Sequence, residues 1–309
     1  MERDARLTRP AMNWTGYIDY WDNFILKWIK DPISLAQNDP LICSLVDVDE
    51  IIDLPEPYYC GVPLDSELDA VLINLNPGKS SVNEWVKFHC FLDNPKAYVS
   101  YELAHCGKSY YNNINKKFNP LLKATRCDVP GKLWWEKRRL KWLDDFFPLG
   151  GRNVHNGYRP ERLYVIEFSP WHSLSNNLHQ FKSLCAPLRE HISSFVIDPL
   201  ADAINRSRLL GGQSGKPYGL CFSKAVYDVL TRHYSFIKLE QWDSNTPSIA
   251  SIWPNNANKR AISRTYALIE GYGSKGQSFR LLCLWYNNIG VNAPSNSFQL
   301  VEQYIKSKI

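Results

Sequence analysis

The segment at residues 70–81, AVLINLNPGKSS, joins a short apolar run to a turn and contains the clearest indication of the fold. Residues 70–75 have the length and composition of a strand that is buried on both faces. The Asn-Pro-Gly at 76–78 is typical of a turn, and the Lys-Ser-Ser at 79–81 stands where a helix can begin. The pattern predicts a strand that runs directly into a helix.

Three further apolar runs of strand length follow, at 163–168, 218–222 and 280–286. Helical patterns lie between and after them. Ser223 is placed to cap a helix that has Val226, Val229 and Leu230 on one face, and a final helix has Phe298, Val301, Tyr304 and Ile305 on one side. The sequence therefore predicts an α/β fold with a mostly parallel four-stranded sheet and helices on both faces. In such sheets a binding site lies outside the carboxyl ends of the strands.

The chain divides on this pattern into a helical N-terminal extension, residues 1–65, and an α/β domain, residues 66–309. Helical spacing in the extension is shown by Tyr17, Trp21, Phe24, Ile25 and Trp28.

Composition sets broad limits on the class of protein. Hydrophobic residues make up 44% of the 309 residues and charged residues 22%, which is enough to form a core. No stretch approaches the ~18 consecutive apolar residues of a membrane-spanning helix, and the first residues do not resemble a signal peptide. We therefore expect a cytoplasmic protein. The net charge of +5 permits a polyanionic partner without requiring one. The eight cysteines have no C-x-x-C spacing, which favours buried free thiols.

Two glycine-rich segments imitate nucleotide-binding motifs. Residues 271–276 match G-x-G-x-x-G but precede a strand, which favours a hairpin turn. Residues 211–216 have the wrong spacing for a phosphate-binding loop, and Pro217 stands where Ser or Thr is needed. We expect a flexible loop there.

Residues 73–81, INLNPGKSS, resemble the first motif of the uracil-DNA glycosylase superfamily, in particular the G-I-N-P-G of its mismatch-specific uracil and thymine branch. Phe88 stands where that branch has an aromatic residue that stacks on the extruded base. Glu167 ends the second predicted strand, where the superfamily often has a base-reading Asn. Pro294-Ser295 follows the fourth predicted strand, as in the second motif of the family.

The chain also departs from the family pattern. Asn74 replaces the Gly that begins the first motif, and Ala293 precedes Pro294 where His or Asn is expected. Asn292 stands one position further back. These departures bear most on the contact to the leaving base.

The resemblance implies a monofunctional DNA glycosylase that needs neither metal nor cofactor. Asn76 would position the attacking water, and Phe88 would stack on the base. Asn292 and Ser295 would hold the leaving base or the flanking phosphate. The backbone amides at the helix start after the first strand would bind a phosphate or the base carbonyl, at Gly78, Lys79 and Ser80.

Glu167 bears on the identity of the base. A carboxylate only accepts hydrogen bonds, so it suits the exocyclic amine of cytosine and disfavours the O4 carbonyl of uracil or thymine. Glu167 as a general base, or paired with a core Arg, is the alternative. Trp171 and His172 follow this strand and are placed to shape a pocket for a bulky 5-substituent, although Trp171 also suits core packing.

The amphipathic stretch 133–143 presents cations that can contact phosphates, namely Lys137, Arg138 and Lys141. A solvated helix face is the alternative, and the basic stretch of Lys259, Arg260 and Arg264 is open in the same way.

The resemblance, together with Glu167, thus implies a glycosylase for a flipped, modified cytosine, such as the glucosylated hydroxymethylcytosine of some phage DNA, and a role in defence against phage. One alternative is a uracil or thymine mismatch glycosylase of base-excision repair. Another is an inactive nucleic-acid-binding module of the same fold. The expected partner is DNA, with no membrane association, and a monomer is expected.

Overall fold

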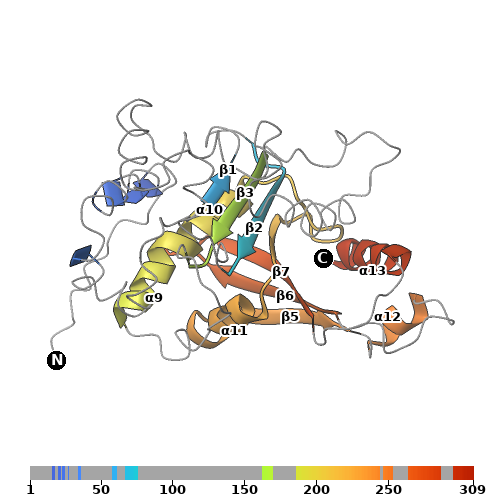
Figure 1. Cartoon of the computed structure of the whole chain (residues 1–309). Coiled ribbons are helices and arrows are strands. Elements are labelled where there is room, and N and C mark those ends of the chain that lie inside the picture. Colours follow the sequence, from blue (N-terminus) through green and yellow to red (C-terminus); the bar gives the residue numbers. More distant parts are fainter. Residues whose placement is uncertain are drawn as a thin grey trace, which may run out of the picture.

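A seven-stranded mixed sheet forms the centre of the computed structural model (Figure 1). Its spatial order is β1-β3-β2-β4-β7-β6-β5. The strands are β1 (Tyr58–Cys60), β2 (Ala70–Asn74), β3 (Leu163–Glu167), β4 (Tyr218–Cys221), β5 (Ile237–Trp242), β6 (Arg264–Tyr272) and β7 (Ser278–Tyr286). The structure describes parts of 16–35 and residues 58–60, 67–75, 162–169, 186–243, 246–252, 264–286 and 295–309.

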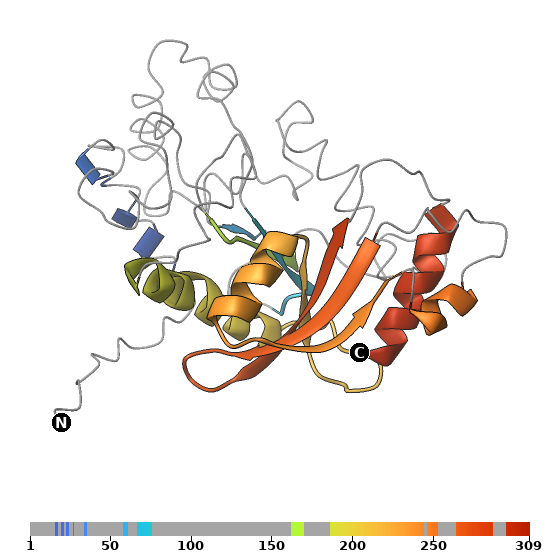
Figure 2. The ribbon, with the colours of Figure 1, turned by 90° about the horizontal axis from the view of Figure 1, so that it is seen from below.

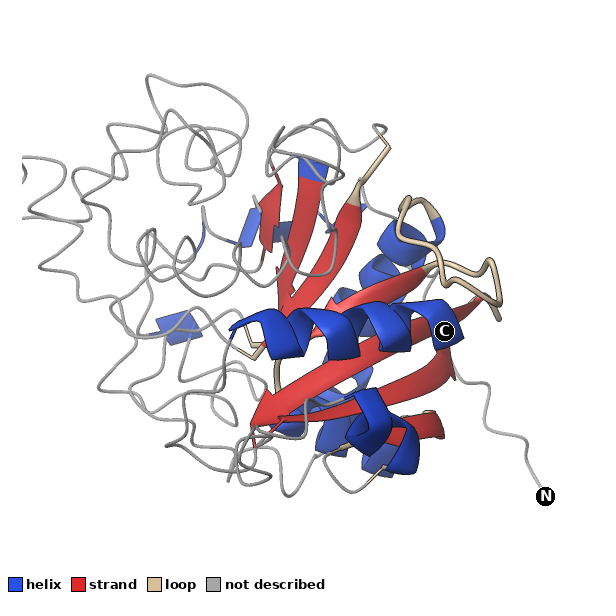
Figure 3. Cartoon of the chain, turned by 90° about the vertical axis from the view of Figure 1, so that its right-hand side faces the viewer, coloured by secondary structure: helices blue, strands red, loops and turns tan. Residues whose placement is uncertain are grey.

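Helices cover both faces of the sheet (Figures 2 and 3). One face is covered by an almost continuous helical segment and by a separate helix: α9 (Ala186–Ile192), the π-helical turn η5 (Ser193–Ile197), α10 (Asp198–Asn205) and α11 (Lys224–His233). The other face is covered by α12 (Pro247–Ile252) and α13 (Ser295–Lys308). The predicted α/β fold with helices on both faces is confirmed.

Strand β2 shows why its sequence is apolar throughout. Val71 and Ile73 pack into the core beneath α9 to α11, whereas Ala70 and Leu72 pack into the core beneath α13. Successive side chains of a strand point to opposite faces, so a strand between two helical layers has no position for an exposed polar residue.

All four predicted strands are present, as β2, β3, β4 and β7, and each is parallel to its neighbour within this group. The prediction of a four-stranded sheet was wrong in extent. Strand β1 adds to β3 in the antiparallel direction, and β6 and β5 add to β7 in the same way. The sheet is therefore mixed.

The two helices with clear sequence patterns are confirmed. Ser223 is the N-cap of α11 and its Oγ accepts a hydrogen bond from the Val226 amide at 3.4 Å. In α13 the side chains of Val301 and Ile305 are buried, and Tyr304 packs against the same core. The side chain of Phe298 lies outside the described residues.

The N-terminal segment belongs to the core of the sheet domain. Tyr17, Trp21 and Phe24 are helical and buried, as the spacing predicted; Ile25 and Trp28 lie outside the described residues. The ring of Tyr20 lies 4.1 Å from that of Phe195 in η5, measured between centroids. The boundary at residue 65 stays a prediction, and β1 lies before it.

Both glycine-rich segments have structural roles. Residues 271–276 end β6 and form the β6–β7 hairpin turn at 273–276, as predicted, and the Ser274 amide and hydroxyl both donate to Asp198 at 2.7 Å. The loop around Gly211 encloses the end of α13. A Cβ at Gly211 would lie 2.4 Å from the carbonyl oxygen of Ile309, so only glycine fits.

Candidate functional site

The carboxyl ends of β2 and β3 lie side by side at one edge of the sheet (Figure 1), and the end of β4 lies beside that of β2 at the same edge. The chain leaves β2 for β3 on one side and then crosses to β4 on the other side of β2. Such a reversal of direction opens a crevice between the strand ends, and ligands of open α/β sheets bind there. The candidate site is therefore the edge formed by the ends of these three strands.

Two polar side chains meet at this edge. Asn74 and Glu167 are the last residues of β2 and β3 and stand opposite each other in the parallel register. The Nδ2 of Asn74 donates a hydrogen bond of 3.0 Å to Oε1 of Glu167. The exposed fraction is 5% for Asn74 and 3% for Glu167. Strand alternation places both side chains on the face that α13 covers.

The backbone holds this pair from both sides. The ladder continues past the strand ends, because the Phe168 amide donates to the Asn74 carbonyl at 2.9 Å and the Ser169 amide donates to the Leu75 carbonyl at 2.8 Å. On the other side of β2, the Phe222 amide donates to the Ile73 carbonyl at 3.3 Å. The two polar side chains thus project from rigid backbone, as a recognition site requires.

The Asn74 side chain has unused hydrogen-bonding capacity. Among the described residues, none donates a hydrogen bond to Oδ1 of Asn74, although that atom is buried. Buried polar atoms of native proteins nearly always have a partner, so this atom needs an explanation. An oxygen that awaits a donor from a ligand is one.

Tyr17 of the N-terminal segment lies close enough to interact electrostatically with Glu167. Burial raises the pKa of Tyr17 above its ordinary value, and the negative charge of Glu167 raises it further. The phenol therefore stays protonated at all physiological pH values.

Phe222 and Ser223 complete the edge at the end of β4. Both are partly exposed, and the ring of Phe222 packs against the same core that lies beneath α13. Strand alternation therefore puts an aromatic ring on the same face as Asn74 and Glu167. Phe222 was not among the predicted site residues, and Asn74 entered only as a departure from a motif. One signal in the sequence could have indicated Asn74: two of the apolar runs contain a polar residue at the position where the strand ends, Asn74 and Glu167.

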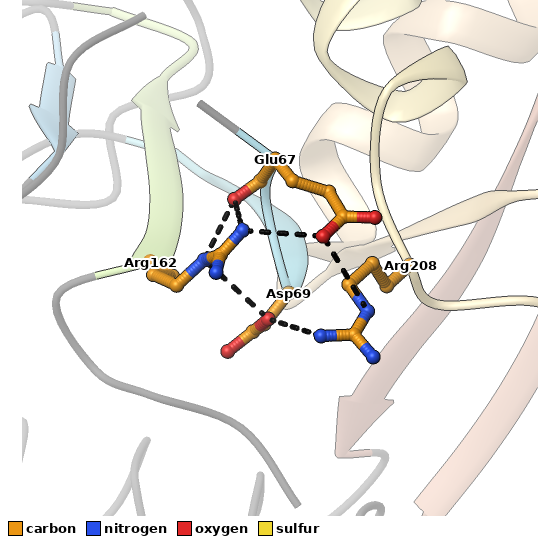
Figure 4. A network of polar contacts seen from close by, with 4 residues as sticks. All are labelled: Glu67, Asp69, Arg162 and Arg208. Atoms are coloured by element: carbon orange, nitrogen blue, oxygen red, sulfur yellow. Dashed lines mark hydrogen bonds and ion pairs between the residues drawn. The ribbon is translucent and has the colours of Figure 1, made fainter. Parts of the chain in front are cut away.

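A second polar cluster, at the opposite edge of the sheet, has a structural role (Figure 4). Arg162 donates from Nε to the Glu67 carbonyl at 2.8 Å and lies 3.7 Å from Asp69 Oδ1. Arg208 contacts Glu67 Oε2 at 3.9 Å and Asp69 Oδ1 at 3.8 Å. Two acids and two bases balance, and the cluster ties the chain at Arg208 to the starts of β2 and β3.

Arg264, one of the basic residues whose role was open, is committed to an internal ion pair. Its Nη1 lies 2.8 Å from Oε1 of Glu302, and the Tyr266 hydroxyl donates to the same oxygen at 2.7 Å. The Arg264 side chain is only 13% exposed, so it is not part of a phosphate-binding surface. The other two basic residues of that stretch lie outside the described residues.

Glu167 is the predicted site residue whose side chain the structure describes. Ser295 is the first residue of α13, but its side chain is outside the described part. All other predicted site residues also lie outside the described residues, and their roles stay predictions: Asn76, Gly78, Lys79, Ser80, Phe88, Lys137, Arg138, Lys141, Trp171, His172 and Asn292.

Within the described part of the chain, no group of three or more His, Cys, Asp or Glu side chains is arranged to hold a metal ion. Cys221 and Cys283 are free and buried on neighbouring strands, as predicted for the thiols, and burial raises the pKa of Cys283. None of the helices in this part is long and apolar enough to cross a membrane.

Comparison of the chain with models of protein families, with curated proteins and with solved structures found no match. The strand-end site itself indicates function: a buried amide and carboxylate, hydrogen-bonded to each other, lie on the same face as an aromatic ring at the reversal point of an α/β sheet.

Proposed function

We propose that the chain is a monofunctional DNA glycosylase that removes a cytosine-type base and leaves an abasic site. The observation that carries the proposal is the buried Asn74–Glu167 pair at the carboxyl edge of the sheet. Its position is where α/β sheets bind ligands, and its chemistry suits the edge of a nucleobase.

Stability alone gives little reason for this pair. Burying a carboxylate costs several kcal/mol, and well-packed apolar residues in place of a buried polar pair are often as stable or more so. Apolar residues occupy every preceding position of β2, from Ala70 to Ile73. A polar pair at the one place where the strands open toward a ligand is therefore better explained by binding.

The resemblance of residues 73–81 to the first glycosylase motif supports the reaction. Asn76 follows Asn74 by two residues along the chain, so the water-positioning residue would leave the same strand end as the base-reading pair. Cleavage requires an extruded base, a water at the anomeric carbon and stabilisation of the departing base anion. Asn76 would hold the water, and Asn292 with Ser295 would stabilise the leaving base or the flanking phosphate.

Glu167 supports a cytosine-type base. An ionised carboxylate accepts from the N4 amine of cytosine, whereas facing it with O4 of uracil places two acceptors together in a dry pocket, at a cost of roughly 1–3 kcal/mol. A glycosylase for unmodified cytosine would damage the host's own DNA. The substrate we favour is therefore a modified cytosine, such as the glucosylated hydroxymethylcytosine of phage DNA.

The test is single-turnover excision from oligonucleotides, single-stranded and duplex, that differ only in the target base. We expect cytosine derivatives to be excised faster than uracil. Glu167→Asn should shift activity toward uracil, because an amide can donate to O4. As the catalytic control, Asn76→Ala should lower excision about a hundredfold or more and leave DNA affinity nearly unchanged.

Faster excision of uracil than of every cytosine derivative by the wild type would contradict the proposal and favour the uracil or thymine mismatch alternative. DNA binding without abasic sites on any substrate would favour the inactive binding module. The replacement of the expected His or Asn by Ala293 is the feature that favours that second candidate.

A further inference from the structure

We infer that Asn74 is a specificity-determining residue, and that the site takes a base with an exocyclic amino group whose two N–H bonds are accepted separately by Glu167 and by Oδ1 of Asn74. This inference rests on the proposed function and narrows its substrate class. It assigns a role to a residue that the glycosylase motif leaves as glycine.

The orientation of the Asn74 amide follows from its bond to Glu167. The NH₂ group faces the carboxyl group, and Nδ2 donates to Oε1 at 3.0 Å. Since an amide is planar, the same bond directs Oδ1 away from the carboxylate.

Oδ1 of Asn74 is therefore left as an acceptor for a ligand. The exposed fraction of Asn74 is 5%, and among the described residues none donates a hydrogen bond to its Oδ1. The carboxylate oxygens of Glu167 are acceptors as well. A carbonyl oxygen of a base that faces these oxygens and Oδ1 of Asn74 would meet acceptors, whereas an N–H would be accepted by either.

An amino group on a base matches this arrangement. It carries two N–H bonds in the plane of the ring, which diverge toward two different acceptors. Adenine has such a group as well as cytosine, so this pair recognises the amine, and the shape of the pocket has to separate the two bases. Uracil and thymine have a carbonyl in this place, and its oxygen would face the same two acceptor oxygens.

The geometry is held in place before a ligand arrives. The carbonyl of Asn74 accepts from the Phe168 amide at 2.9 Å, and Ile73, one residue earlier, is bonded to Phe222 at 3.3 Å. Asn74 is thus fixed by its backbone on both sides and by Glu167 through its side chain. A fixed acceptor discriminates strongly, because it cannot turn to offer a donor.

Methylation of the amine distinguishes recognition by one acceptor from recognition by two. An N4-methyl group leaves cytosine with a single N–H. We would measure affinity and single-turnover excision for cytosine and 5-hydroxymethylcytosine, each with and without N4-methyl, and use non-cleavable 2′-fluoroarabino nucleotides for affinity. In the wild type we expect methylation to weaken binding roughly tenfold or more, because one buried acceptor loses its donor.

In Asn74→Ala the methyl group should leave the binding affinity almost unchanged, because Glu167 still accepts the remaining N–H. Asn74→Leu fills the same volume without polar atoms and gives the same test where the smaller side chain destabilises the fold. Asn205→Ala is the matched control. It removes an amide from α10 that donates to the Ala201 carbonyl at 2.9 Å, and it should keep the full methyl effect.

An equal methyl effect in the wild type and in both Asn74 variants would overturn the inference, since a steric clash and not a lost acceptor would then explain it. Wild-type binding that prefers uracil would overturn it as well. Absence of excision together with the expected pattern of affinities would instead contradict the proposed reaction and leave amine recognition by Asn74 supported.

Discussion

Glu302 of α13 shows how much one buried charge depends on its partners. Its side chain is fully buried, and its Oε1 accepts from Arg264 at 2.8 Å and from Tyr266 at 2.7 Å. Burial raises the pKa of Tyr266, and the negative charge of Glu302 raises it further, so this phenol remains a donor. The three side chains join α13 to β6 beneath the helical layer.

Glu302→Ala should lower the free energy of unfolding by roughly 3–5 kcal/mol, because it removes the carboxylate that pairs with the largely buried Arg264 guanidinium. Urea unfolding checks this. Asp228→Asn breaks the exposed Lys224–Asp228 pair of α11, which is 2.7 Å long, and should cost less than about 0.5 kcal/mol. Equal losses in the two variants would show that the Glu302 contact is not energetically special.

At the scale of the element, α9 has an unusual contact with the N-terminal segment. His191 is buried, with its ring 4.4 Å from that of Phe195 and 6.3 Å from that of Trp21, measured between centroids. Burial lowers the pKa of His191 from 6.5 to about 3. The ring is therefore neutral in the folded chain at any pH at which the protein works.

This shift makes the fold sensitive to acid. Between pH 6.5 and about 3 the unfolded chain binds a proton at His191 that the folded chain does not, so the free energy of unfolding falls as the pH falls through that range. At pH 5 the loss from this residue should be about 2 kcal/mol relative to pH 7.5. His191→Phe should remove that part of the difference in urea midpoints.

His233→Phe is the matched control, because this ring lies at the partly exposed end of α11. The control should retain the wild-type loss of stability on acidification. An unchanged pH dependence in His191→Phe would mean that His191 is accessible to protons in the folded chain.

The position of a strand in the sheet decided whether the sequence predicted it. Strands β2, β3, β4 and β7 are central and buried on both faces, so their apolar runs stand out. Strand β5 is an edge strand with five exposed residues out of six, and its pattern IKLEQW resembles a polar segment. Strand β1 has only three residues, too few for a periodic signal.

The candidate site was predicted in part for a similar reason. Glu167 stands out as a charge at the end of an apolar run, and its position relative to the strand is local information. Its hydrogen bond to Asn74 joins residues 93 positions apart and depends on the register between β2 and β3. No local pattern contains that register, so the pairing could be found only from the structure.

At the scale of the whole molecule, the sheet consists of two parts with different connections along the chain. Strands β5, β6 and β7 form an antiparallel meander within residues 237–286, closed by the hairpin turn at 273–276. In the other part, β2 pairs with β3 and with β4, and Leu72 and Leu220 meet across almost half of the chain. The two parts are joined where β4 pairs with β7 in the parallel direction.

This division determines the order in which the chain can fold. Pairing of distant strands requires closure of long loops before any contact rewards it, so it is slow, whereas a meander forms from local contacts. Residues 264–286 should therefore become protected first in pulse-labelled hydrogen exchange during refolding, and residues 70–74 last. On the ribosome the order of synthesis is the reverse. The apolar strand β2 emerges early, whereas its pairing strands β3 and β4 are synthesised much later. Until β3 and β4 are synthesised, β2 is an exposed apolar segment that a chaperone has to bind. The newly made chain is therefore most prone to aggregation at the strand that contains Asn74.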